Sequence, residues 1–213
     1  MVQIKKPQVR DAILASALRL FRKGGYTATT TSQIAAGAGL SESNLYVYFR
    51  SKLEIFFGIY EPWLRERVGR LEAGIANEPD RRERLRAVLV MILRELPAAD
   101  DGFTNNLTQA LSAARRKEGY RPALLQWYEA RIEAMLSAAI RPPRSAALGA
   151  SALGDLSHLL IMAHDGFSLS HHLLPARVCS EQTIELLCDL LLGKIVKQRA
   201  VPKKSRSRNK PTT

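Results

Sequence analysis

The stretch GGYTATTTSQIAAGAGLSESNLYVYFRSK, residues 24–52, decides the fold of the N-terminal part of the chain. Gly24 and Gly25 are expected to end a first helix, because glycine readily takes the left-handed conformation that closes a helix. The run of three threonines offers an N-cap for a short second helix, Gly39 makes the turn, and Ser41 caps a short third helix. The helices that this pattern predicts cover residues 10–23, 31–38 and 42–49. The stretch therefore reads as a helix-turn-helix.

The remaining chain is helical as well. Apolar residues recur at three- and four-residue steps, and runs of alternating β-branched residues are missing. Ser51 and Glu54 form a predicted capping box at the start of the fourth helix, in which Pro62 should introduce a kink. Asp80 is a predicted cap and Pro97 a predicted stop. The further predicted helices run from 51 towards 75 and over 80–96, 102–117, 121–140, 145–173 and 180–199.

We therefore predict an all-α protein with three parts. Residues 1–52 form a three-helix helix-turn-helix domain, and residues 53–199 form a second helical domain. Residues 200–213 lack apolar side chains and are expected to be disordered. No apolar run is long enough to span a membrane. Few cysteines and no secretory signal favour a cytoplasmic protein.

The positive charge is concentrated at the two ends of the chain. Of the net charge of +12, residues 1–52 carry +6 and residues 194–213 carry +8, while residues 53–193 carry −2. Basic ends on a nearly neutral body suggest a polyanionic partner. A basic surface that only keeps the protein soluble is an equal alternative. The same choice applies to the basic tail, which either adds phosphate contacts or solubilises the chain.

The helix-turn-helix carries a resemblance to a known family. Two-turn helices fit the major groove of DNA, and helix N-termini present free amides to phosphates. The stretch 24–52 resembles the DNA-binding signature of the tetracycline-repressor (TetR/AcrR) family. The matching positions are Gly25-Tyr26, Ala28-Thr29-Thr30, Ile34-Ala35, Ala38-Gly39-Leu40-Ser41, Leu45-Tyr46, Tyr48-Phe49 and Ser51-Lys52. The resemblance implies a homodimer that binds a double-stranded DNA operator and responds to a small-molecule effector. It also implies that residues 53–199 are the helical ligand-binding and dimerisation domain.

The resemblance also implies roles for individual residues. Hydroxyls at the start of the second helix are expected to contact phosphate and sometimes a base, and polar residues at the start of the third helix to read bases. Tyrosines and a lysine are expected to bind phosphates, unless they pack or stay solvated. The predicted DNA-contacting residues are Thr30, Thr31, Ser32, Glu42, Ser43, Asn44, Tyr46, Val47, Tyr48 and Lys52. Glu42, Ser43 and Val47 depart from the common family pattern, so the operator sequence stays open.

Four histidines in the second half raise a different possibility, a metal-binding or enzymatic protein built on residues 158–172. His164 and His171 lie seven residues apart, about 10.5 Å along a helix, which is too far for one metal ion. No nucleophile–base motif or phosphate-binding glycine loop is visible. We therefore expect no catalytic residues, no metal site and no cofactor. His164 is predicted to line a cavity or to form a hydrogen bond in the core.

Large apolar residues with a few polar tips are the candidates for an effector pocket, against the alternative of ordinary core. They are Trp63, Met91, Trp127, Tyr128, Met135, His164 and Phe167. Small residues over 145–154 and a leucine stripe from Leu186 to Ile195 predict a dimer interface through the last two helices. A general DNA-binding protein without an inducer is the main alternative to this ligand-responsive regulator, which we expect to act as a repressor.

Overall fold

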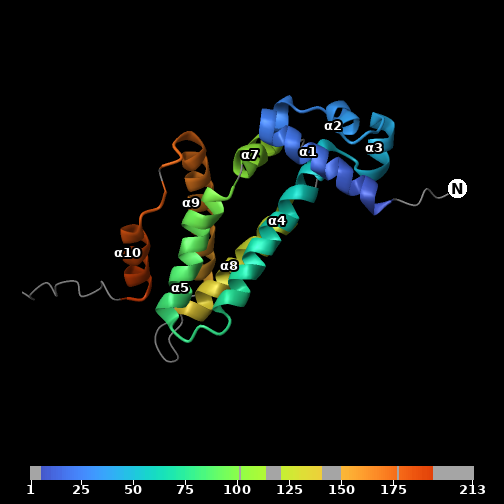
Figure 1. Cartoon of the computed structure of the whole chain (residues 1–213). Coiled ribbons are helices and arrows are strands. Elements are labelled where there is room, and N and C mark those ends of the chain that lie inside the picture. Colours follow the sequence, from blue (N-terminus) through green and yellow to red (C-terminus); the bar gives the residue numbers. More distant parts are fainter. Residues whose placement is uncertain (1–5, 101, 114–120, 141–149, 177, 194–213) are drawn as a thin grey trace, which may run out of the picture.

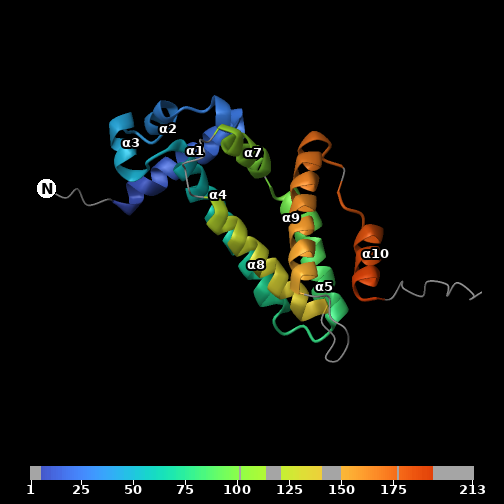
Figure 2. The ribbon, with the colours of Figure 1, turned by 180° about the vertical axis from the view of Figure 1, so that it is seen from behind.

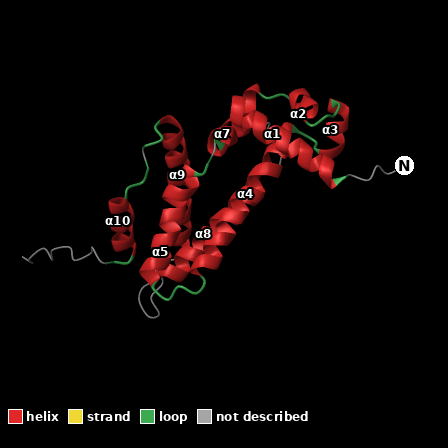
Figure 3. Cartoon of the chain, viewed as in Figure 1, coloured by secondary structure: helices red, strands yellow, loops and turns green. Residues whose placement is uncertain are grey.

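The computed structural model describes residues 6–100, 102–113, 121–140, 150–176 and 178–193, and every regular element in these ranges is helical (Figure 3). The elements are α1 (Pro7–Ala28), α2 (Thr31–Gly37), α3 (Glu42–Tyr48), α4 (Lys52–Ile75), α5 (Arg81–Val90), the π-turn η1 (Met91–Glu95), α6 (Leu96–Ala98), α7 (Phe103–Ala113), α8 (Arg121–Ile140), α9 (Ala150–Leu173) and α10 (Glu181–Leu191). The all-α prediction is confirmed. None of the described helices is long and apolar enough to cross a membrane.

Helices α1, α2 and α3 form one end of an elongated molecule, and α4 leads from them into the body (Figure 1). Their shared core contains Ile13, Ile34, Leu45 and Phe49, all buried. The predicted caps are present: the Thr30 side chain accepts a hydrogen bond from the Gln33 amide, and Ser41 does the same for α3. These helices fold as a helix-turn-helix because α2 packs on α1, α3 packs on α2, and each short helix buries one or two apolar residues in the shared core.

The C-terminal end of the first helix is marked by its two glycines. The helical run extends to Ala28, but it consists of two pieces that meet in a kink at Gly25. Gly25 has non-helical angles, with φ of 79° and ψ of 167°, so the first helical piece ends at the two glycines, as predicted, and a short second piece follows to Ala28. Only glycine takes this φ without strain, which explains why the bend is placed there.

The body packs α8 against α9 and α5, with α4 on one side and α10 on the other (Figure 2). Four arginine-centred ion pairs of Arg82 and Arg86 on α5, with Glu181, Glu185 and Asp189, attach α10 to α5. Helix α7 reaches from the body back to α1 and packs against it. The N-terminal unit is therefore held by two elements, α4 and α7.

Two predicted helix signals act differently from expectation. Pro97 does not stop the helical run, which continues to Ala98 after the π-turn η1. The Glu54 carboxylate accepts from the Arg50 amide at 2.6 Å and not from Ser51, whose side chain accepts from the Glu54 amide. Helix α4 continues through Pro62. Parts of the predictions for 102–117, 145–173 and 180–199, and the whole tail 200–213, lie outside the described residues.

Candidate DNA interface and ligand cavity

The recognition helix predicted from the sequence is α3, and it lies at the far end of the molecule from α10 (Figure 1). Its apolar face is fixed by Leu45 and by Phe49 at its C-cap, both buried. Ser43 and Asn44, which follow the cap residue Ser41, are exposed. The first turn of α3 therefore presents polar side chains to solvent while the rest of the helix is anchored.

The Glu42 carboxylate joins the N-termini of α2 and α3. It accepts hydrogen bonds from the hydroxyls of Thr31 and Ser32. These two bonds lower the pKa of Glu42, and the bond from Ser32 has the larger effect. The protons of both hydroxyls are thus committed to the carboxylate, so neither hydroxyl can donate to a phosphate in this arrangement. DNA contacts by Thr31 and Ser32 stay a prediction, and they require Glu42 to release the hydroxyls.

The two tyrosines of α3 have different surroundings. The Tyr46 side chain is 48% exposed, and its hydroxyl lies 3.3 Å from the Thr31 hydroxyl, so it belongs to the same polar patch. Tyr48 is half-buried, and its hydroxyl accepts from the Lys6 amide at 3.3 Å. Val47 is also half-buried. Tyr46 is thus the tyrosine placed to reach a ligand outside the protein.

Lys52, at the first position of α4, binds the end of α1. Its ammonium donates to the carbonyls of Tyr26 and Thr29 at 2.8 and 2.7 Å and lies 4.2 Å from the centre of the Tyr26 ring. Burial lowers its pKa. An ammonium has three donors, so one hydrogen remains for a phosphate. The structure therefore adds a role in joining α1 to α4 that the sequence did not indicate.

The sequence also does not indicate how closely α1 and α2 approach each other. The buried Ser16 hydroxyl donates to the Ile34 carbonyl at 3.0 Å. A Cβ atom at Gly37 would lie 2.3 Å from the Ser16 oxygen, closer than van der Waals contact allows. Gly37 therefore sets the distance between the two helices.

The body contains an apolar cavity of about 330 Å³ between α4, α7, α8 and α9. Its walls are mostly leucine and aromatic side chains, with polar groups from Tyr60, Tyr128, His164 and Asp165. Tyr128 and His164 are the two predicted pocket residues that this cavity brings together. A mostly apolar cavity of this size with a few polar groups is typical of a small-molecule site.

His164 is held by the π-turn. The Leu96 amide donates to the Met91 carbonyl, one residue further back than in an α-helix, and this leaves the Ile92 carbonyl without its usual donor. The next residue, Pro97, has no N–H to offer. The Nδ1 atom of His164 lies 3.3 Å from this oxygen and fills the gap. His164 therefore does both things that the sequence offers as alternatives: it lines the cavity and it forms a hydrogen bond in the core.

Burial sets the ionisation of the cavity's polar groups. Burial lowers the pKa of His164 to about 4, so its imidazole is neutral at neutral pH. Burial, with a smaller effect of Asp100, raises the pKa of Asp165 to about 6. Burial also raises the pKa of Tyr60 and of Tyr128, so both keep their protons. At neutral pH the cavity thus contains a carboxylate and three neutral polar groups.

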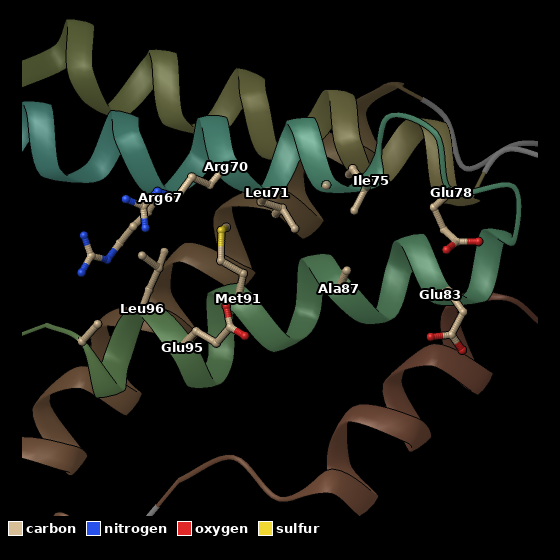
Figure 4. Close-up of a pocket in the computed structure, with 12 residues that line it drawn as sticks. Arg67, Arg70, Leu71, Ile75, Glu78, Glu83, Ala87, Met91, Glu95 and Leu96 are labelled. Atoms are coloured by element: carbon tan, nitrogen blue, oxygen red, sulfur yellow. The ribbon is translucent and has the colours of Figure 1, made fainter.

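The other predicted pocket residues lie elsewhere. Trp63 belongs to an aromatic cluster, with its ring 4.9 Å from that of Phe103. Met91 lines a different groove of about 620 Å³ between α4 and α5, in which it faces Leu71 (Figure 4). Residues that pack in or against the core without lining the 330 Å³ cavity are Trp127, Met135 and Phe167. Side-chain size alone could not separate cavity walls from core.

The histidine-rich segment forms no metal-type cluster among the described residues. His158 pairs with Glu129 of α8 at 2.9 Å on the surface, while His164 is buried. His171 and His172 lie in the last turn of α9, where cations are favourable to the helix dipole.

Helices α9 and α10 both expose large apolar side chains. Helix α9 presents large apolar side chains at three- and four-residue steps, and α10 adds two more. These residues, called the apolar face below, are Leu159, Met162, Leu169 and Leu173 on α9 and Leu186 and Leu190 on α10. Met162 also lines the 330 Å³ cavity. Exposed apolar side chains that gather on one side of a helix are typical of an interaction surface.

Comparison with known proteins agrees with this architecture. The family model for bacterial regulatory proteins of the tetR family matches residues 13–59, which cover α2, α3 and parts of α1 and α4. The nucleoid occlusion factor SlmA of Citrobacter koseri is 32% identical over 143 residues, which make up 67% of this chain and 71% of SlmA. The chain belongs to the tetR family of bacterial regulatory proteins. This tetR-family protein is a DNA-binding transcription regulator.

Solved structures extend the likeness in fold to most of the chain. The fatty acid degradation regulator FadR of Bacillus halodurans has a TM-score of 0.63 at 16% identity, over 92% of this chain and 100% of FadR. A TetR transcription regulator from Haloarcula marismortui has a TM-score of 0.61 at 17% identity, over 87% and 95% of the two chains. At these identities the likeness concerns the fold of the tetR-family regulator alone.

Proposed function

We propose that this tetR-family regulator binds a palindromic operator as a homodimer and leaves it when a small-molecule effector occupies the 330 Å³ cavity. The observation that carries the proposal is the combination of an exposed first turn on an anchored recognition helix with an apolar cavity that contacts α4. Helix α4 begins in the DNA-binding unit and ends in the body, so a change at the cavity can reach α3 through it. We expect such release to make the protein a repressor.

The proposed DNA contacts come from the patch around the N-termini of α2 and α3. Ser43 and Asn44 are exposed there, and Asn44 is the side chain suited to a bidentate contact with adenine. We expect Asn44→Ala to weaken operator binding by about 1–3 kcal/mol and binding to random DNA much less. Gln126→Ala, at an exposed position on α8, is the matched control. Equal losses on both DNAs would contradict base reading by Asn44.

The proposed dimer uses the apolar face of α9 and α10. Two copies that meet through it bury this face, which is unfavourable in water. We expect Leu169→Glu to convert the dimer to a monomer in sedimentation velocity, because it places a charge within the buried face. Gln126→Glu adds the same charge on α8 outside the face and should leave the dimer intact. A Leu169→Glu protein that stays dimeric would contradict this interface.

An aromatic cluster supports the proposed coupling between cavity and DNA-binding unit. Tyr60 lines the cavity and stacks on Phe56, with 5.8 Å between ring centres. Phe56 in turn packs against Phe21 and Tyr26 of α1, with 6.0 and 5.9 Å between the ring centres. A ligand that moves Tyr60 therefore pushes on side chains of the DNA-binding unit. One neighbour in fold, a FadR from Bacillus subtilis, is in complex with stearoyl-CoA, and this supports a ligand site in the proposed regulator.

The effector part of the proposal is tested by linkage. A compound that stabilises the protein in a thermal-shift screen must weaken operator binding, and operator DNA must weaken binding of that compound by the same factor. Ligands that bind with no effect on DNA affinity would contradict the effector role.

A further inference from the structure

The polar groups of the 330 Å³ cavity define which ligands it can accept. Among the described residues that line it, none is a lysine or arginine, so this part of the lining offers an anionic ligand no positive charge. The polar atoms that lack a hydrogen-bond partner within the described structure include the Tyr128 hydroxyl and Nε2 of His164. Both side chains are nearly fully buried, at 4% and 2% exposure. Buried polar atoms without a partner are costly, so a ligand that pairs them gains affinity.

The hydrogen bond to the π-turn determines which ring nitrogen of His164 carries the hydrogen. A carbonyl oxygen can only accept, so Nδ1 must carry the hydrogen in its contact with the Ile92 carbonyl. In a neutral imidazole the other nitrogen, Nε2, is then an acceptor. The cavity therefore offers a lone pair at this position and requires a donor from the ligand.

Asp165 adds a second acceptor to the same cavity. Asp100 is a like charge that disfavours the ionised form of Asp165, and Tyr60, Tyr128 and His164 are neutral, so none of these groups supplies a counter-charge. A cationic group in the cavity would supply the missing counter-charge. The Tyr128 hydroxyl can accept from the same group, because a hydroxyl has lone pairs as well as a hydrogen.

We propose that the cavity of this regulator binds a lipophilic amine, whose ammonium group donates to His164 Nε2 and pairs with Asp165 while its apolar part fills the leucine-lined space. This inference names the ligand class of the effector site and rests on the proposed function only for the consequence of binding. A fatty acid or another apolar anion should bind the described lining more weakly, because Asp165 repels a carboxylate and none of the described lining residues is a lysine or arginine.

Matched probes test the ligand class directly. Octylamine, octanol and octanoate share one apolar chain and differ only in the head group, and calorimetric titration of the DNA-free protein gives their affinities. We expect octylamine to bind at least about tenfold more tightly than octanoate, with octanol between them. Octanoate affinity equal to or above that of octylamine would overturn the proposal.

Two variants locate the contact. Asp165→Asn keeps the shape of the side chain and removes its charge, so we expect octylamine affinity to fall about tenfold and octanol affinity to change less than about twofold. The matched control is Asp155→Asn, an exposed carboxylate on the same helix outside the cavity, which should change neither affinity. Unchanged octylamine binding to Asp165→Asn would overturn the assigned position of the ammonium group.

Nitrogen NMR of the imidazole provides a readout that needs no variant of the cavity. The chain has four histidines, so His158→Gln, His171→Gln and His172→Gln identify the remaining His164 signals. We expect protonated Nδ1 and unprotonated Nε2 in the free protein, and a shift of Nε2 when octylamine binds. Hydrogen on Nε2 in the free protein would overturn the assignment of this nitrogen as the acceptor.

These outcomes separate the ligand class from the regulatory role. The titrations contain no DNA, so a preference for octanoate overturns the amine proposal and leaves DNA regulation untouched. Octylamine that binds as expected but leaves operator affinity unchanged confirms the ligand class and contradicts the effector role.

Discussion

The charge of Asp165 should destabilise the free protein, and Asp165→Asn should relieve it. Burial raises its pKa from the ordinary value of 3.8 to about 6, so the folded protein holds this proton more firmly than the unfolded chain does. The contribution of Asp165 to stability is therefore fully present below pH 3.8 and is lost as the pH rises through 6. The whole difference corresponds to about 3 kcal/mol, and because the side chain is only half-buried we expect about 1–2 kcal/mol.

Urea unfolding of the two proteins at pH 4 and pH 8, at one protein concentration, measures this effect. We expect Asp165→Asn to raise the free energy of unfolding by about 1–2 kcal/mol at pH 8 and by much less at pH 4. His164 has a lowered pKa and loses stability in the opposite direction as the pH falls, but it is present in both proteins and largely cancels. A stability difference that is the same at both pH values would refute the reasoning.

Three further substitutions probe the DNA-binding unit. Gly37→Ala should lower the free energy of unfolding by about 1–3 kcal/mol through its clash with Ser16. Gly69→Ala, with open space around it, should not destabilise the protein. Equal effects of the two substitutions in urea unfolding would contradict the close approach of α1 and α2. Lys52→Met should lower the free energy of unfolding by about 1–3 kcal/mol in the same assay, because two carbonyls lose a charged donor. An unchanged urea midpoint would contradict the role of Lys52 in joining α1 to α4. Glu42→Gln should tighten binding to random DNA by about two- to fivefold at low salt in fluorescence anisotropy, because an acid is removed from the phosphate-facing patch; weaker binding would contradict this.

The DNA-binding unit was predictable from the sequence because its signals are local. Hydroxyl caps at Thr30 and Ser41 and the glycine turn between them lie within a few residues of the helices they define. The contacts of Glu42 and Lys52 were not predictable, since they depend on how α2, α3 and the end of α1 meet in space. Local chemistry thus indicated the elements, and tertiary packing decided which polar groups are already paired.

The effector cavity was only partly predictable. Tyr128 and His164 were candidates by residue type, but Trp63 has the same character and lies in the aromatic cluster instead. Asp165 was missed as a cavity residue, because a single acid in an apolar helix carries no signal of the direction in which it points. The sequence does not indicate the π-turn that fixes His164 either. Pro97 predicts a helix stop, whereas in the structure its missing N–H leaves the Ile92 carbonyl to the His164 side chain.

Selection of bound sequences from random double-stranded DNA tests the central claim most directly. A dimer that places two copies of α3 in successive major grooves must enrich a palindrome whose half-sites are centred about one helical turn apart, or a multiple of it. We predict such a palindrome, and we predict that Asn44→Ala loses preference at defined positions within each half-site. Enrichment of no motif, with similar affinity for all sequences, would contradict the account and indicate a general DNA-binding protein.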